Sequence, residues 1–214
     1  MQEGALMETF YGGFKLIHYK KGEVILHAGD IPRGVFSLVK GYVRQYSISP
    51  EGEEFTSIIF MPGDFFPSIW AVHGSEFLYY LETLTPVELR CVPRDEFLSS
   101  IKSHHEMCFN LSSKILVRMG GLMTRMEHLV FGNAADKVTS ILILCAERFG
   151  QKSGQGVELP MVLSHKQIAS LVGVSRETAS VEIKNLEREG FVGYKKRRIV
   201  IKNIEELKSH SLLR

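Results

Sequence analysis

Residues 164–190 read as two short helices joined by a tight turn, and this pairing constrains the fold more than any other stretch. Ser164 is a candidate N-cap, and Gln167 completes a capping box that satisfies otherwise unbonded backbone N–H groups. Gly173 stands where the turn needs a residue without a Cβ, and Ser175 can cap the second helix. The apolar positions give each helix one inner face, made of Ile168, Ala169, Leu171 and Val172 in the first and Ala179, Ile183 and Leu186 in the second.

The start of the second predicted helix leaves Arg176, Glu177, Thr178 and Ser180 facing outward. In a helix-turn-helix this end enters the major groove of DNA. Arg can bond guanine O6 and N7, a carboxylate can accept from cytosine N4, and a hydroxyl suits a base edge or a phosphate. An ordinary helical hairpin with a solvated tip would have the same two helices. The flanking sequence therefore has to distinguish such a hairpin from a DNA-binding helix-turn-helix. Further candidate DNA contacts are Ser164, Lys166, Val181 and Lys184.

The stretch that follows predicts a β-hairpin with a basic tip, as in the wing of a winged helix. Residues 191–194 and 199–201 are its strands, and its tip is Lys195, Lys196, Arg197 and Arg198. Residues 164–202 hold nine Lys and Arg against four Glu, whereas residues 1–103 hold nine against thirteen Asp and Glu. A chain of formal charge +2 thus concentrates its positive charge here, which indicates DNA binding.

The rest of the composition bounds the class of protein. The 214 residues, 44% of them hydrophobic, suffice for two small domains. We expect no membrane span and no signal peptide at MQEGALMETF. Three scattered cysteines, without a C-x-x-C pair, suit a reducing compartment, so we expect a cytoplasmic protein without a metal site.

Residues from about 14 to 100 read as short strands with turn residues about every ten positions, which predicts an all-β roll, jelly-roll-like in form. A short helix over 93–103 then leads into a long one. From Cys108 the apolar residues recur at steps of four and three, typical of a heptad seam. We expect a parallel dimer helix with an interface of Ile115, Met119, Leu122, Met126 and Leu129. A buried helix of a monomer is the alternative.

Gly120 and Gly121 lie in the middle of this helix and cost about 1 kcal/mol each in helix propensity. Close packing of a partner helix would explain them. Asn133 can cap a following helix over 134–149, and residues 150–156 are expected to be a flexible loop. The tail after Lys202 is predicted to be a short helix containing Leu207, Leu212 and Leu213.

The expected fold class is therefore α+β. The N-terminal β-roll, a sensor domain, comprises residues 1–103, the dimerisation helix 104–132, and the C-terminal winged helix-turn-helix 133–214.

With these parts assembled, the chain resembles the CRP/FNR family of bacterial transcription regulators. The resemblance runs from about Phe14 to Ile201 and is carried by KKGEVILHAGD, FSLVKGYVRQY and PGDFF in the roll and by SHKQIASLVGVSRETAS in the helix pair. It implies a dimer with an effector-sensing roll, a DNA reader and RNA polymerase as a partner. Arg176 and Glu177 fall on the family's base-reading positions, and Ser180 on a position used by its FNR branch.

The chain departs from the family pattern in the reader and in the sensor. Val181 replaces a second reading arginine, and Glu182 would repel phosphates. Cyclic-nucleotide members carry Gly-Glu and Arg-Ser pairs for the ribose and phosphate, where this chain has Pro67-Ser68 and Phe77-Leu78. Leu122 and Met123 stand in place of their base-contacting Thr-Ser. The N-terminal cysteines that hold an iron–sulfur cluster in oxygen-sensing members are also missing. We therefore expect an effector other than a cyclic nucleotide.

The candidate effector pocket is apolar and comprises Phe65, Trp70, Phe77, Tyr79, Leu122 and Met123. These residues can equally be core and dimer seam. Haem bound by His73, or a thiol switch of Cys91 and Cys108, are further options.

Two other functions compete with an effector-gated regulator. One is a ligand-independent regulator controlled by its abundance. The other is a metal-dependent enzyme on the roll, but His18 and His27 are isolated and His104 and His105 splay apart. We therefore expect no enzyme.

Overall fold

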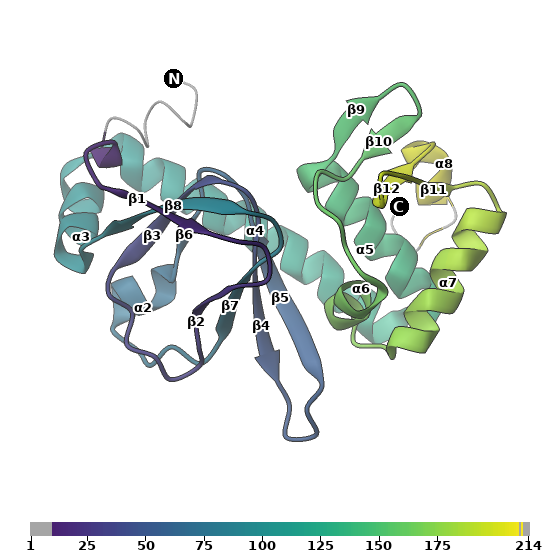
Figure 1. Ribbon diagram of the computed structural model, residues 1–214, viewed down its shortest axis with the longest axis horizontal. Helices are drawn as coiled ribbons and strands as arrows, with labels where there is room; N and C mark the ends of the chain where they lie inside the picture. Colours follow the sequence, from purple (N-terminus) through teal and green to yellow (C-terminus); the bar gives the residue numbers. More distant parts are fainter. Residues whose placement is uncertain (1–9, 210, 212–214) are drawn as a thin grey trace. The chain divides into compact units, whose positions relative to one another are not determined.

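The computed structural model describes residues 10–209 and 211 (Figure 1). The N-terminal stretch tested for a signal peptide and two tail leucines, Leu212 and Leu213, lie outside them. The chain divides into two compact units. Unit 1 holds residues up to 48 and 56–116, and unit 2 holds 49–55 and 117 onward. The three-part division expected from the sequence remains a prediction.

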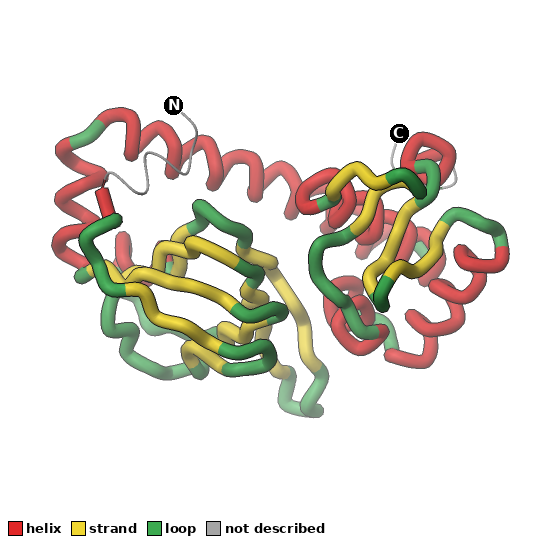
Figure 2. The backbone as a smooth tube through the Cα atoms, turned by 45° about the horizontal axis from the view of Figure 1, so that its top comes forward, coloured by secondary structure: helices red, strands yellow, loops and turns green. Residues whose placement is uncertain are grey.

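Unit 1 is the predicted roll, built from two four-stranded sheets (Figure 2). One has the order β1-β8-β3-β6 and the other β2-β7-β4-β5, with the neighbouring strands antiparallel wherever register is defined. The strands are β1 (Leu16–Tyr19), β2 (Val24–Leu26), β3 (Val35–Lys40), β4 (Val43–Ile48), β5 (Glu54–Phe60), β6 (Phe65–Phe66), β7 (Tyr80–Thr83) and β8 (Val87–Val92).

Two apolar clusters lie in the described part of the roll. The larger lies between the sheets and is made of inward-facing residues such as Phe36 of β3, Phe66 of β6 and Leu81 of β7. The second packs Phe65 against helices α2 (Ser68–His73), α3 (Arg94–Ser103) and the start of α4 (His105–Phe131). The predicted helix over 93–103 and the long helix after it are both confirmed.

Unit 2 is helical with a small sheet. Helix α5 (Ala134–Phe149) begins with the predicted cap, because Asn133 and Asp136 form a capping box. Its buried face packs against α6 (His165–Val172), α7 (Arg176–Arg188) and α8 (Ile204–Ser209). None of the helices in the described part of the chain is long and apolar enough to cross a membrane.

The expectation of a flexible loop over residues 150–156 is wrong. The chain forms β9 (Gln151–Ser153) and β10 (Gly156–Glu158), which pair with each other. β10 also pairs with β12 (Arg198–Ile201), which in turn pairs with β11 (Val192–Lys195), so the sheet order is β11-β12-β10-β9. The partner strand comes from far along the chain, so the polar local sequence does not indicate it.

Candidate nucleic-acid interface

Both helices of the predicted reader have the caps that the sequence indicates. Ser164 Oγ accepts the Gln167 N–H at 3.2 Å, while Gln167 Oε1 accepts the Ser164 N–H at 2.9 Å. Gly173 ends α6 in the left-handed region, with φ 63°, which a residue without a Cβ adopts at no steric cost. Ser175 Oγ then accepts the Thr178 N–H at 3.0 Å and starts α7. These short-range bonds hold the two helices at a defined turn.

The outer face of α7 begins with Arg176 and Glu177. Both side chains are exposed, and neither has a hydrogen-bond or ion-pair partner among the described residues. The inner positions Ala179, Ile183 and Leu186 are buried, so the helix cannot rotate this face away from solvent. Val181 is 54% exposed, and Lys184 is exposed one turn after Ser180. This face presents a guanidinium, a carboxylate and a methyl-bearing side chain along one helix, a set that can read base edges.

Three of the DNA contacts predicted on the helix pair already have partners within unit 2. The Thr178 hydroxyl lies 2.9 Å from Ser175 Oγ, so it belongs to the cap. The Ser164 hydroxyl is likewise part of the cap of α6. Lys166 Nζ lies 2.6 Å from Glu54 Oε1.

The structure gives Glu182 a role within α7. Its Oε2 accepts a hydrogen bond from Asn185 Nδ2 at 3.2 Å, and Asn185 Oδ1 accepts one from Arg188. The three residues follow each other at steps of three along one side of the helix, where such neighbours interact. Glu182 therefore supports the helix through this chain of bonds.

The predicted wing is confirmed as the β11-β12 hairpin. Its two-residue turn is Lys196 and Arg197, with φ values of 48° and 68°. Hairpins favour turns with positive φ at both central residues, but Asn and Gly usually occupy them. Non-glycine residues in this region cost about 1–3 kcal/mol each and cluster at functional sites. Both side chains are exposed at the tip of the wing.

The other two wing cations share one carboxylate on a neighbouring strand. Glu158 of β10 has one oxygen 3.2 Å from Lys195 Nζ and the other 3.1 Å from Arg198 Nη1. Hydrogen bonds from Arg198 and then Lys195 lower the pKa of the Glu158 carboxyl. Within the described chain, the wing therefore consists of two unpaired cations at the turn and two paired ones behind it. Sequence reasoning missed Glu158 because it lies 40 residues before Arg198.

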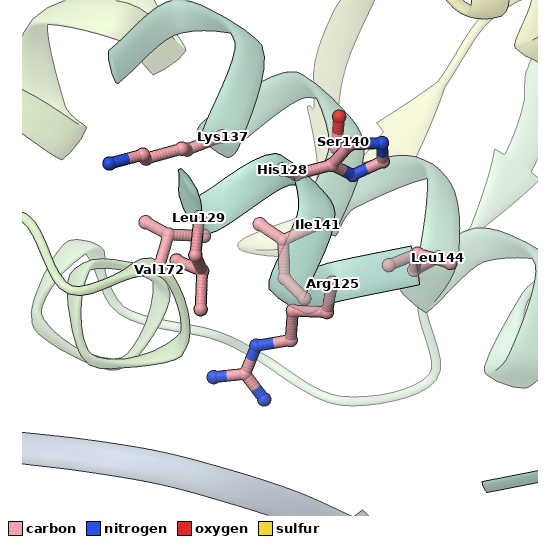
Figure 3. A pocket seen from close by; sticks show the side chains of 8 residues that line it. All are labelled: Arg125, His128, Leu129, Lys137, Ser140, Ile141, Leu144 and Val172. Carbon is pink, nitrogen blue, oxygen red and sulfur yellow. The ribbon is translucent and has the colours of Figure 1, made fainter. Parts of the chain in front are cut away.

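A buried arginine ties α4 to the reader. Arg125 donates to the carbonyl oxygen of Leu171, near the end of α6, and its guanidinium lies 4.8 Å from the Phe55 ring centre. Burial lowers the pKa of Arg125 to about 10, so it stays charged at neutral pH. Figure 3 shows its guanidinium on the opposite side of a small pocket from His128 and Ser140. An arginine within an apolar helix stripe is the one hint of this contact in the sequence.

The residues of the predicted dimer interface lie along α4. Ile115, Met119, Leu122 and Met126 are exposed, whereas Leu129 is half-buried and contributes to the small pocket beside α5. Further apolar side chains exposed on this helix are Phe109, Leu116, Val117, Met123, Val130 and Phe131. A Cβ added at Gly120 or Gly121 would meet no atom within 4 Å.

The predicted effector residues are distributed over several environments. Phe65 and Phe77 are buried in different clusters of the roll, Trp70 packs against the first, and Tyr79 is 37% exposed. Leu122 and Met123 are exposed on the part of α4 that belongs to unit 2. This pocket remains a prediction.

The residues suggested for haem binding and for a thiol switch are His73, Cys91 and Cys108. His73 is exposed at the end of α2. Among the described residues, no three His, Cys, Asp or Glu side chains form a potential metal site. Cys108 is exposed, and burial raises the pKa of the half-buried Cys91 thiol.

Comparison with known proteins matches both units. Residues 16–104 match the family model described as "Cyclic nucleotide-binding domain", and residues 136–210 match the one described as "Crp-like helix-turn-helix domain". The chain is 27% identical to the transcriptional regulator SdrP of Thermus thermophilus, over 89% of this chain and 93% of that protein. It is 23% identical to the CRP-like cAMP-activated global transcriptional regulator of Mycobacterium tuberculosis, over 89% and 85%.

Solved structures share the fold. A CRP-family transcriptional regulator from Thermus thermophilus superimposes with a TM-score of 0.75 at 22% identity, covering 91% of this chain and 96% of that one.

Proposed function

Because the chain belongs to the CRP/FNR family of transcription regulators, we propose that it binds a near-palindromic DNA operator as a homodimer, under the control of an effector other than a cyclic nucleotide. Regulators of this family bind DNA and are typically dimeric. Its helix-turn-helix is a DNA-binding domain. We place its action in the cytoplasm, with RNA polymerase as a further partner.

The observation that carries sequence-specific binding is the start of α7. Arg176 and Glu177 are exposed there and have no partner among the described residues, beside a wing whose tip adds two unpaired cations. Side chains on the helix can distinguish bases, whereas wing cations contact phosphates and add affinity for any sequence. The reader thus combines specificity and general affinity on separate elements.

The apolar stripe of α4 supports the homodimer. Met119, Leu122 and Met126 are exposed large apolar side chains on one helix, and contiguous exposed apolar surface marks interaction sites. Gly120 and Gly121 have open space around them within the chain. A second copy of α4 packed against this stripe accounts for both observations.

The effector proposal rests on the sensor residues. The match to a cyclic nucleotide-binding domain identifies the type of domain. The side chains of this domain are the basis for inferring which ligand it binds. At the position of the family's phosphate arginine stands Phe77, buried in the roll core. A cyclic phosphate would have no charge-assisted hydrogen bond at that position. A regulator controlled by abundance alone is the competing form, and native mass spectrometry of the isolated protein distinguishes it by the absence of a bound small molecule.

Selection from a random DNA library with the purified full-length protein tests the proposal. We expect a two-fold symmetric site with half-site centres about 34 Å apart, one helical turn. Enrichment of a single asymmetric half-site contradicts the dimeric operator. Recovery of unselected sequences contradicts specific binding altogether.

A further inference from the structure

The roll contains a cavity that lies among its N-terminal strands and includes none of the predicted effector residues. It measures about 380 Å³ and is bounded by β1, β2, β3, β8 and the segment that precedes β3. Its apolar lining residues are Ile17, Ile25, Leu26, Phe36 and Ile31, of which Ile31 is largely exposed to solvent. Pockets for small organic ligands start at about 300 Å³ and combine apolar walls with few polar groups. This cavity has the required volume, and its walls combine five apolar residues with Tyr19, Asp30, Arg33 and Cys91.

Arg33 supplies the cation of the cavity. Arg33 is exposed, and among residues 10–209 and 211 its guanidinium has no hydrogen-bond or ion-pair partner. It lies close enough to two other lining residues to act on them, since it partly offsets the burial that raises the pKa of Tyr19 and of Cys91. Arg33, Tyr19 and Cys91 all line the same cavity.

Asp30 does not serve as the counter-ion. Its Oδ2 accepts the His27 backbone N–H at 2.8 Å and lies 3.5 Å from His27 Nδ1. The carboxylate of Asp30 is thus used to hold the turn before β3. An anionic group of a ligand can then engage Arg33.

Cys91 has a fixed place at the wall. A methyl group at Gly34 would lie 3.0 Å from Cys91 Sγ and 2.4 Å from the Val92 carbonyl oxygen. Glycine at this position therefore lets β3 approach β8 closely. The thiol of Cys91 is half-buried, so its reactivity reports whether the cavity is filled.

We propose that this cavity binds a small carboxylic acid with an apolar tail, its carboxylate on Arg33 and its tail against Leu26 and Phe36. A planar guanidinium binds a carboxylate in a two-pronged arrangement, and the buried side chains of Leu26 and Phe36 offer the tail apolar surface. The proposal does not depend on DNA binding, because the ligand site lies wholly within the roll.

Calorimetric titration of the full-length protein with sodium octanoate tests the charge, and octanamide is the uncharged control. We expect saturable octanoate binding below about 1 mM, and octanamide weaker by about tenfold or more. Arg33→Gln should weaken octanoate binding by the same factor. Lys102→Gln removes an exposed cation on α3 and should bind octanoate as tightly as the parent protein does.

Modification by N-ethylmaleimide, followed by peptide mass spectrometry, tests the location. Octanoate should slow modification of Cys91 and leave that of the exposed Cys108 unchanged. Absence of saturable binding up to about 10 mM, equal binding of octanamide, or binding that leaves Cys91 unprotected each overturns the proposal. None of these assays contains DNA, so failure of the DNA-binding proposal would be seen separately.

Discussion

At the scale of single residues, we expect specificity to depend on two neighbouring side chains at the start of α7, Arg176 and Glu177. Arg176→Ala and Glu177→Ala should each weaken binding to the preferred operator by about 1–3 kcal/mol, because one set of base-edge bonds is lost. Each should also relax selection at one base pair. Binding-site selection with each variant measures both effects.

The control for these variants is Glu187→Ala, an exposed carboxylate near the far end of the same helix. It should leave the selected sequence unchanged. If Arg176→Ala and Glu177→Ala select the same sites as the parent, these residues do not read bases.

Close backbone packing makes Gly150 a stability determinant. A Cβ at this position would lie 2.2 Å from the Ala146 carbonyl oxygen and 2.3 Å from Val157 Cγ1, whereas one at Gly154 would meet nothing within 4 Å. Gly150→Ala should therefore destabilise the protein by about 1–3 kcal/mol through overpacking. Urea denaturation followed by circular dichroism measures the loss, with Gly154→Ala as the matched control. Equal midpoints for the two variants would contradict the packing argument.

At the scale of elements, the wing should contribute affinity without specificity. Replacing Lys195, Lys196, Arg197 and Arg198 together should weaken binding to all DNA and flatten its salt dependence, by about 0.9 in slope for each phosphate that is no longer neutralised. Because Glu158 pairs with Lys195 and Arg198 only, the four wing cations should contribute unequally to the salt dependence. The Lys196→Ala, Arg197→Ala double variant should flatten the slope more than Lys195→Ala, Arg198→Ala, because Glu158 already offsets one of the two positive charges of the latter pair.

Fluorescence anisotropy at several salt concentrations, with operator and unrelated DNA, measures both double variants. A change in sequence preference without a change in slope would show that the wing reads bases. Equal slopes for the two double variants would contradict the role given to Glu158.

Helix α4 should hold the two copies together. Met119→Lys or Leu122→Lys would place like charges opposite each other in a desolvated seam, at a cost of about 3–5 kcal/mol. Sedimentation velocity should then show a monomer. Ser113→Lys adds the same charge at an exposed polar position of α4 and should leave the dimer intact. A dimer unaltered by both seam variants removes this helix from the interface.

At the scale of the whole molecule, the sensor should not respond to cyclic AMP or cyclic GMP. By resemblance to the cyclic-nucleotide members, Phe77 stands where they have an arginine for the phosphate, and Leu122 and Met123 stand where they have hydroxyls for the base. A lost charged hydrogen bond costs about 1.5–3 kcal/mol, which weakens a ligand by about tenfold or more. Calorimetric titration of the full-length protein should show no saturable binding at micromolar concentration, with a cyclic-AMP-responsive family member as the positive control. Micromolar binding of either nucleotide would show that the sensor positions given to Phe77, Leu122 and Met123 are wrong.

The sequence determined the elements whose cause is local. The caps at Asn133, Ser164 and Ser175, the turn at Gly173 and the basic wing each depend on residues within a few positions of one another, and all are present in the structure. Alternation of apolar residues likewise predicted the roll, because a half-buried strand repeats every two residues. The family follows from the same short motifs.

Tertiary structure alone decided the contacts between distant segments. The β9-β10 hairpin exists because β12 offers it a partner strand, although its own sequence is polar. Glu158 pairs with a residue 40 positions away, and Arg125 bonds a carbonyl 46 positions away. The Arg33 cavity combines four strands and the segment before β3 in the same way. Such contacts depend on which surfaces the packed core brings together, and no local pattern of residues records that.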